Sequence, residues 1–302
     1  MNELNISFAQ NITRKPDENT SQTQFGNSTS ASAAEISVFL NDDTPPDEVP
    51  VSELTKQEKK ALKKQQKAEA KAERERIRTT PDGIIQGGRQ GSTAGDCWLL
   101  AEMNSMAKTD WGKEAFKNGI STDEDGNYIV HFKGVHKDIK ITKEDFKKAQ
   151  NDSDYSSNDA DALLYEIAVE RHFQEENINN GSIKGNDLAG EDSLQYLLTG
   201  RKGRQVSKVE QFEPILKAMG EKPENNNGIS ATYIYHDNNP DNVGDIDHAM
   251  SVQQVLLDEN GGIDKVIVLD SYHPDKPQTL SYKTFKNNVK LFGYVTTPKE
   301  NK

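Results

Sequence analysis

The stretch Gly95-Asp96-Cys97-Trp98-Leu99-Leu100-Ala101 contains the single cysteine of a chain of 302 residues. Apolar residues continue beyond it, which predicts a buried helix over residues 97–108 with Asp96 placed to cap its first turn. Unpaired N–H groups and aligned peptide dipoles at a helix N-terminus favour an anion, so Cys97 is placed as a reactive thiolate would be. An inert buried thiol is the alternative, since free cysteine is often buried.

A general base and an orienting acceptor are available far downstream. His248 opens a strand-like run, and Asp270 ends the next apolar strand, Val266–Leu269. Thiol enzymes commonly bring their histidine from a distant part of the chain, and a third group orients its imidazole. Because two adjacent strands can bring these side chains together, Cys97, His248 and Asp270 are the candidate catalytic residues. A core histidine and a turn aspartate are the alternative interpretations.

These segments resemble the catalytic core of the calpain family of papain-like cysteine proteases. The matching stretches are Gln90-Gly91 followed by Gly95–Ala101, Ala162–Ala168, Leu198-Thr199-Gly200, His248–Val252 and Val266–Asp270. The resemblance covers about residues 84–296, which correspond to the protease core alone. It does not extend to the calcium-binding and membrane-binding modules that animal calpains append. It implies an α+β, papain-like fold, with a helical N-terminal lobe, a β-rich C-terminal lobe and the cleft between them.

The resemblance also implies a role for each site residue. Cys97 would be the nucleophile, His248 the base and then the acid, and Asp270 the orienting acceptor. Gln90 would donate to the oxyanion together with the backbone N–H of Cys97. The implied activity is cleavage of protein or peptide substrates through an acyl-enzyme, that of a cysteine endopeptidase.

The chain departs from the family pattern at three places. Gln90 lies seven residues before Cys97, one more than the family's usual spacing, so a bulge at residues 92–94 or another oxyanion donor is expected. Asp270-Ser271-Tyr272-His273 stands where the family has Asn-Pro-Trp-Gly, which leaves open what shields the acceptor from water. Asp247 replaces a small glycine, and we expect it to narrow the cleft or raise the pKa of the histidine.

Two other functions stay open. A transglutaminase-like acyltransferase also uses a Cys-His-Asp triad, and Asp270 favours it slightly, whereas Asp96 and Leu99-Leu100-Ala101 favour the protease. The departures also suit a protease-shaped binding or regulatory protein with weak or no catalysis.

Composition divides the chain into three parts. Residues 1–54 are polar and are expected to form a disordered tail, with a targeting or autoinhibitory segment that uses the apolar patch 36–40 as the alternative. Residues 55–80 are highly charged and predict a solvated helix or linker. The foldable part is 81–302, with a helical lobe over about 81–205 carrying the cysteine and a β lobe over about 206–302 carrying the histidine and aspartate. Within the first lobe, the pattern predicts a second buried helix over residues 159–173 and two paired strands at 127–132 and 137–141.

Charge and hydropathy limit the partners. A net charge of −12 argues against a general nucleic-acid binder, and no apolar run is long enough to span a membrane. The N-terminus does not read as a signal peptide, so the cytoplasm is the default expectation, although non-classical secretion would leave no such trace.

No cofactor is required by the sequence, but calcium binding stays open. The acidic loops 237–247 and 123–127 contain oxygen ligands without the spacing of an EF-hand, so no metal ligand is assigned. No paired Cys/His spacing indicates zinc.

Overall fold

The fold is known from a computed structural model that describes residues 55–91, 94–156, 158–185, 190–226, 228–235 and 246–295. The described residues form a mixed α+β structure with two antiparallel sheets, which confirms the predicted α+β class. The expectation of a disordered tail concerns residues 1–54, which lie outside the described residues.

Helices dominate the first half of the described chain. They are α1 (Lys56–Thr79), α2 (Cys97–Met106), α3 (Asp110–Lys117), α4 (Lys143–Ala149), α5 (Ala160–Glu176), the 3₁₀ turn Ile178–Gly181 and α6 (Leu194–Thr199). The two helices predicted to be buried, α2 and α5, are confirmed, because nearly every residue of α2 and most of α5 are buried. The short helices α3, α4 and α6 were not predicted; Thr109, Thr142 and Ser193 cap them by accepting backbone N–H bonds.

A small sheet accompanies these helices. Strands β2 (Tyr128–Phe132) and β3 (Lys137–Ile141) pair antiparallel as predicted, and a third strand, β1 (Ile120–Thr122), extends the sheet in the order β1-β2-β3. Gly126, in the turn between β1 and β2, has a φ of 76°, a conformation that glycine adopts without strain.

The second sheet has six strands in the order β4-β9-β5-β6-β7-β8. Their bounds are β4 (Gly203–Val206), β5 (Ser230–Tyr235), β6 (Ile246–Leu257), β7 (Ile263–Asp270), β8 (Gln278–Ser281) and β9 (Val289–Val295), with α7 (Val209–Glu221), the 3₁₀ turn Pro223–Asn225 and α8 (Tyr282–Asn288) between them. Because β4 pairs with β9, the residues of this sheet begin at Gly203, slightly before the expected division between lobes.

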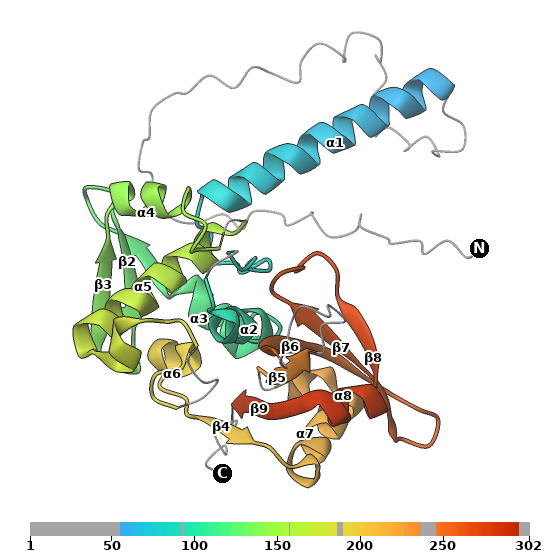
Figure 1. Cartoon of the computed structure of the whole chain (residues 1–302). Coiled ribbons are helices and arrows are strands. Elements are labelled where there is room, and N and C mark those ends of the chain that lie inside the picture. Colours follow the sequence, from blue (N-terminus) through green and yellow to red (C-terminus); the bar gives the residue numbers. More distant parts are fainter. Residues whose placement is uncertain are drawn as a thin grey trace, which may run out of the picture. The chain divides into compact units, whose positions relative to one another are not determined.

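Two hydrophobic cores meet at α2 and β6. The first is built by α2, α5 and the small sheet, and the second by α7, α8 and the large sheet. Strand β6 contributes to both, since Ala249 belongs to the first core while Met250 and Val252 belong to the second. Helix α2 packs against β6, and Figure 1 shows them side by side. This packing brings the N-terminal half of the chain against a strand from its last quarter.

The charged segment before the folded part forms α1, which has no buried residue. Its C-terminal end is tied to the rest of the chain: Arg76 pairs with Asp82 at 2.9 Å, and Gln150 donates to the carbonyl of Arg78 at 3.0 Å. No helix in the described residues combines the length and apolar character needed to cross a bilayer.

Replacing Trp98 tests the first core. Its ring is 2% exposed and stacks on Phe173, with centroids 6.0 Å apart, and its indole N–H donates to the carbonyl of Ile183 at 2.6 Å. We expect Trp98→Ala to lower the free energy of unfolding by about 3–5 kcal/mol in urea denaturation. Ile84→Ala is the control and should change it by no more than about 0.5 kcal/mol, since Ile84 is 57% exposed. Equal losses in the two variants would contradict this packing.

Candidate active site

Cys97 is the first residue of α2, at the point where the buried helix begins. Its side chain is partly buried, and its backbone N–H is one of those that a helix leaves without an intrahelical acceptor. Gly95, two residues before Cys97, has a φ of 66°, a conformation that glycine adopts without strain and that lets the chain bend into the helix. The thiol therefore lies where the helix dipole favours a negative charge.

His248 and Asp270 lie on the neighbouring strands β6 and β7. The register pairs Met250 with Asp270, so the aspartate is opposite the residue two positions after the histidine. Nε2 of His248 lies 2.8 Å from Oδ1 of Asp270, and both side chains are about 8% exposed. Cys97 lies close enough to His248 to raise the pKa of the imidazole through hydrogen bonding and charge, and Nδ1 is the ring nitrogen that the contact with Asp270 leaves free. The structure thus brings the three candidate catalytic residues together.

The contacts of this triad favour the charged form of the imidazole. Burial lowers the pKa of His248, but hydrogen bonds to Asp270 and Cys97 and their negative charges outweigh burial and raise it to about 9. Burial likewise raises the pKa of Asp270, but the hydrogen bond to His248 prevails and leaves it below its usual value. At neutral pH the site therefore holds an imidazolium between an aspartate and the cysteine sulfur.

An aromatic ring covers the histidine. Tyr272 stacks on the imidazole of His248 with ring centroids 5.0 Å apart and an interplanar angle of 18°. Its backbone N–H donates to Oδ1 of Asp270 at 2.8 Å. The sequence analysis left open what shields the acceptor from water. Tyr272 covers one face of the imidazole, although the residue itself is 43% exposed.

Gln90 joins the site through the turn after β7. Its backbone N–H donates to the carbonyl of Ser271 at 2.9 Å, and the hydroxyl of Ser271 donates to Oε1 of Gln90 at 3.0 Å. The second bond occupies the side-chain amide oxygen of Gln90 and leaves its amide N–H₂ as the group that can donate to an oxyanion. The expected bulge at residues 92–94 falls largely outside the described residues, since 92 and 93 are not described.

The sequence analysis missed a pair of buried carboxyl groups, Asp96 and Glu166, next to Cys97. Asp96 was expected to cap α2, but its side chain accepts no capping hydrogen bond and faces Glu166 of α5 instead. Both residues are fully buried, and the backbone N–H of Ser156 donates to both oxygens of Glu166 at 2.9 and 3.0 Å. Burial, and for Glu166 also the charge of Asp96, raises both pKa values. The pair therefore holds a proton more strongly than two exposed carboxyl groups would.

Whether the chain binds calcium stays open, as it was in the sequence. In the part of the chain that the structure describes, no three His, Cys, Asp or Glu side chains gather in a group that could hold a metal ion. Asp123 in the first acidic loop is instead paired with Lys140 at 2.8 Å and bonded to Asn127. The second loop lies outside the described residues at 237–245, and the side chain of Asp247, expected to affect the cleft, is also outside them.

The chain matches no protein-family model, and no curated protein matches it. What the site can do therefore follows from the groups it contains: the sulfur of Cys97, an imidazole with its carboxylate acceptor, the backbone N–H of Cys97 and the amide of Gln90.

Alkylation with iodoacetamide tests the link between Cys97 and His248. Because the chain has one cysteine, the reaction reports on this site alone. An ordinary thiol is only a few per cent ionised at pH 7, so His248→Ala should slow alkylation about tenfold or more by removing the imidazolium. His131→Ala, a histidine outside the site, should leave the rate unchanged. Equal rates in wild type and His248→Ala would contradict the pairing.

The carboxyl pair predicts a pH-dependent stability. An acid whose folded pKa is raised releases its proton on unfolding, so stability falls as pH rises above the ordinary carboxyl pKa of about 4. Glu166→Gln removes this titration. Its free energy of unfolding relative to wild type should therefore rise as pH increases above about 4.

The matched control is Glu259→Gln, since Glu259 is exposed and its substitution should give no such trend. Chemical denaturation at each pH measures the difference. A difference in free energy of unfolding between Glu166→Gln and wild type that stays constant or narrows as pH rises would contradict the raised pKa values of the pair.

Proposed function

We propose that this chain is a cysteine hydrolase that cleaves peptide bonds. The observation that carries the proposal is the unbroken series of contacts from Cys97 at a helix N-terminus through His248 to Asp270, with 2.8 Å between the last two. A chain of nucleophile, base and orienting acceptor is the arrangement that nucleophilic acyl transfer requires.

The proposed reaction has two stages. The thiolate of Cys97 attacks the peptide carbonyl carbon, and the carbonyl electrons move to the oxygen, where the N–H of Cys97 and the amide of Gln90 stabilise the charge. The tetrahedral intermediate collapses, the imidazolium of His248 gives its proton to the departing amine, and a thioester remains. His248, now neutral, takes a proton from water as the water attacks the thioester. Collapse then releases the acid and restores the thiolate and imidazolium.

Within this class, the resemblance of the motifs supports a calpain-like core with a papain-like fold. The nucleophile lies on a buried helix of a mainly helical region, whereas the histidine and aspartate lie on strands of a larger antiparallel sheet. This division of the site between two regions agrees with the arrangement that the resemblance implies. The proposed substrates are proteins or peptides.

A second candidate is a transglutaminase-like acyltransferase, because the acceptor is the carboxylate Asp270, as in that class. The two activities share the thioester and differ in what attacks it, an amine or water. A non-catalytic, protease-shaped protein is the third candidate. The meeting of Cys97, His248 and Asp270 supports catalysis over that possibility.

Incubation with casein tests the proposal. Wild-type protein should cleave it, and Cys97→Ala should lower kcat/KM by at least about a thousandfold because the substitution removes the proposed nucleophile. Asp270→Asn keeps the size of the acceptor and should lower activity less than His248→Ala. Cleavage by Cys97→Ala at the wild-type rate would overturn the assignment.

Two additions to the same assay separate the alternatives. Parallel reactions with calcium and with a chelator test the calcium expectation. Reactions with an added primary amine distinguish the two enzymes: incorporation of the amine without net cleavage would favour the acyltransferase over the hydrolase.

A further inference from the structure

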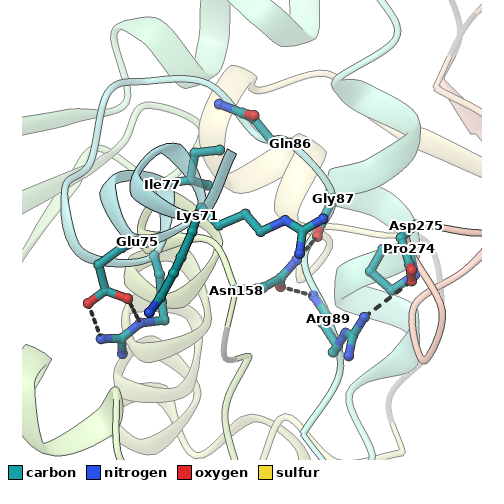
Figure 2. A pocket seen from close by; sticks show the side chains of 11 residues that line it. Lys71, Glu75, Ile77, Gln86, Gly87, Arg89, Asn158, Pro274 and Asp275 are labelled. Atoms are coloured by element: carbon teal, nitrogen blue, oxygen red, sulfur yellow. Dashed lines mark hydrogen bonds and ion pairs between the residues drawn. The ribbon is translucent and has the colours of Figure 1, made fainter. Parts of the chain in front are cut away.

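A hollow of about 540 Å³ lies beside the candidate active site, walled by the C-terminal half of α1, residues 86–89 and the turn at Pro274-Asp275 (Figure 2). We name it the basic pocket. Its charged lining residues are Lys71, Arg74, Glu75, Arg78, Arg89 and Asp275. The pocket thus joins residues 71–89 with Asn158 and a turn from the distant C-terminal part of the chain.

The pocket carries an excess of positive charge. Four basic and two acidic side chains line it, and both acids are engaged: Glu75 pairs with Arg78 at 2.7 Å and Asp275 with Arg89 at 3.2 Å. Lys71 and Arg74 form no ion pair with any other described residue. In a chain of net charge −12, such a local excess of cations suits an anionic partner.

The walls of the pocket are continuous with the catalytic residues. Arg89 directly precedes Gln90, and Pro274-Asp275 follow shortly after Asp270. Asn158 holds the wall in place by donating to the carbonyl of Gly87 at 2.6 Å and accepting from the backbone N–H of Arg89 (Figure 2). The pocket is therefore set at a fixed position relative to the oxyanion donor and the base.

The proposed chemistry says which part of a substrate reaches this pocket. The departing amine takes its proton from His248, so it lies on the imidazole side of the nucleophile. Tyr272 stacks on the same imidazole, so the turn that follows Tyr272 lies on the side toward which the substrate residues attached to that amine would extend. That turn ends in Pro274-Asp275, one wall of the basic pocket.

We propose that the basic pocket binds acidic substrate residues on the C-terminal side of the cleaved bond, with Lys71 and Arg74 as the specificity-determining cations. The proposal rests on the proposed function and names its substrate class: proteins in which Asp or Glu follows the cleavage site. The partly buried residues Ile77 and Pro274 also line the pocket and supply apolar contact.

Binding to an inactive enzyme tests the proposal without relying on turnover. Two fluorescent peptides are compared on full-length Cys97→Ala by anisotropy; they differ only in having Asp and Glu, or Asn and Gln, in their C-terminal half. The acidic peptide should bind about three- to tenfold more tightly, and added salt should reduce the difference, as for a few exposed charge contacts.

Substitution of both cations locates the effect. Lys71→Ala with Arg74→Ala should abolish the preference and leave binding of the neutral peptide unchanged. The matched control is Lys60→Ala with Lys63→Ala, the same change in net charge on the same helix but outside the pocket. Loss of the preference in the control as well, or equal binding of the two peptides, would overturn the proposal.

The chain's own acidic stretch is the competing occupant. If the preference emerges only after Asp42, Asp43, Asp47 and Glu48 are replaced by their amides in the full chain, the N-terminal segment fills the pocket and the substrate proposal is wrong. Absence of casein cleavage by wild type, with the peptide preference intact, would instead refute the proposed hydrolase and leave the anion-binding pocket.

Discussion

The packing of α2 against β6 is the constraint on which the rest of the structure depends. Strand β6 sends Ala249 into one core and Met250 into the other, so a slip of one residue would exchange the faces of the strand and disrupt both cores. The same packing fixes His248, which directly precedes Ala249. It also fixes the N-terminus of α2, because the helix is buried along its length. Core packing therefore sets the distance between the sulfur and the imidazole.

Two pairs of buried ionisable groups lie beside that contact, and their charges interact in opposite ways. His248 and Asp270 keep their charges despite burial because each hydrogen-bonds to an opposite charge, a pairing whose loss leaves an uncompensated charge. Asp96 and Glu166 would carry like charges when ionised, so burial raises both pKa values and the charge of Asp96 raises that of Glu166 further. The first pair stabilises a charged imidazole beside Cys97, whereas the second resists ionisation next to the start of α2.

The sequence predicted elements with strong local patterns and missed those decided by tertiary contacts. The apolar run after Cys97, the alternation in β2 and β3 and the strands of His248 and Asp270 were predictable, because burial repeats at the period of the element. Glu166 was not, since α5 is buried on nearly all sides and its pattern does not say which polar residue faces Asp96. Strands of three or four residues, β1 and β4, are too short for a period and form by pairing with neighbours. The roles of Ser271 and Tyr272 depend on the register of β6 and β7, which no local signal contains.

The most direct test of the central claim is an NMR titration of the His248 ring in protein labelled at histidine. With six histidines in the chain, a His248→Gln sample assigns the signal. The account expects a midpoint at about 9, with both ring nitrogens protonated at pH 7.5, and a lower midpoint in Asp270→Asn. A His248 ring that is neutral at pH 7.5 and titrates at or below the ordinary value of about 6.5 would contradict it.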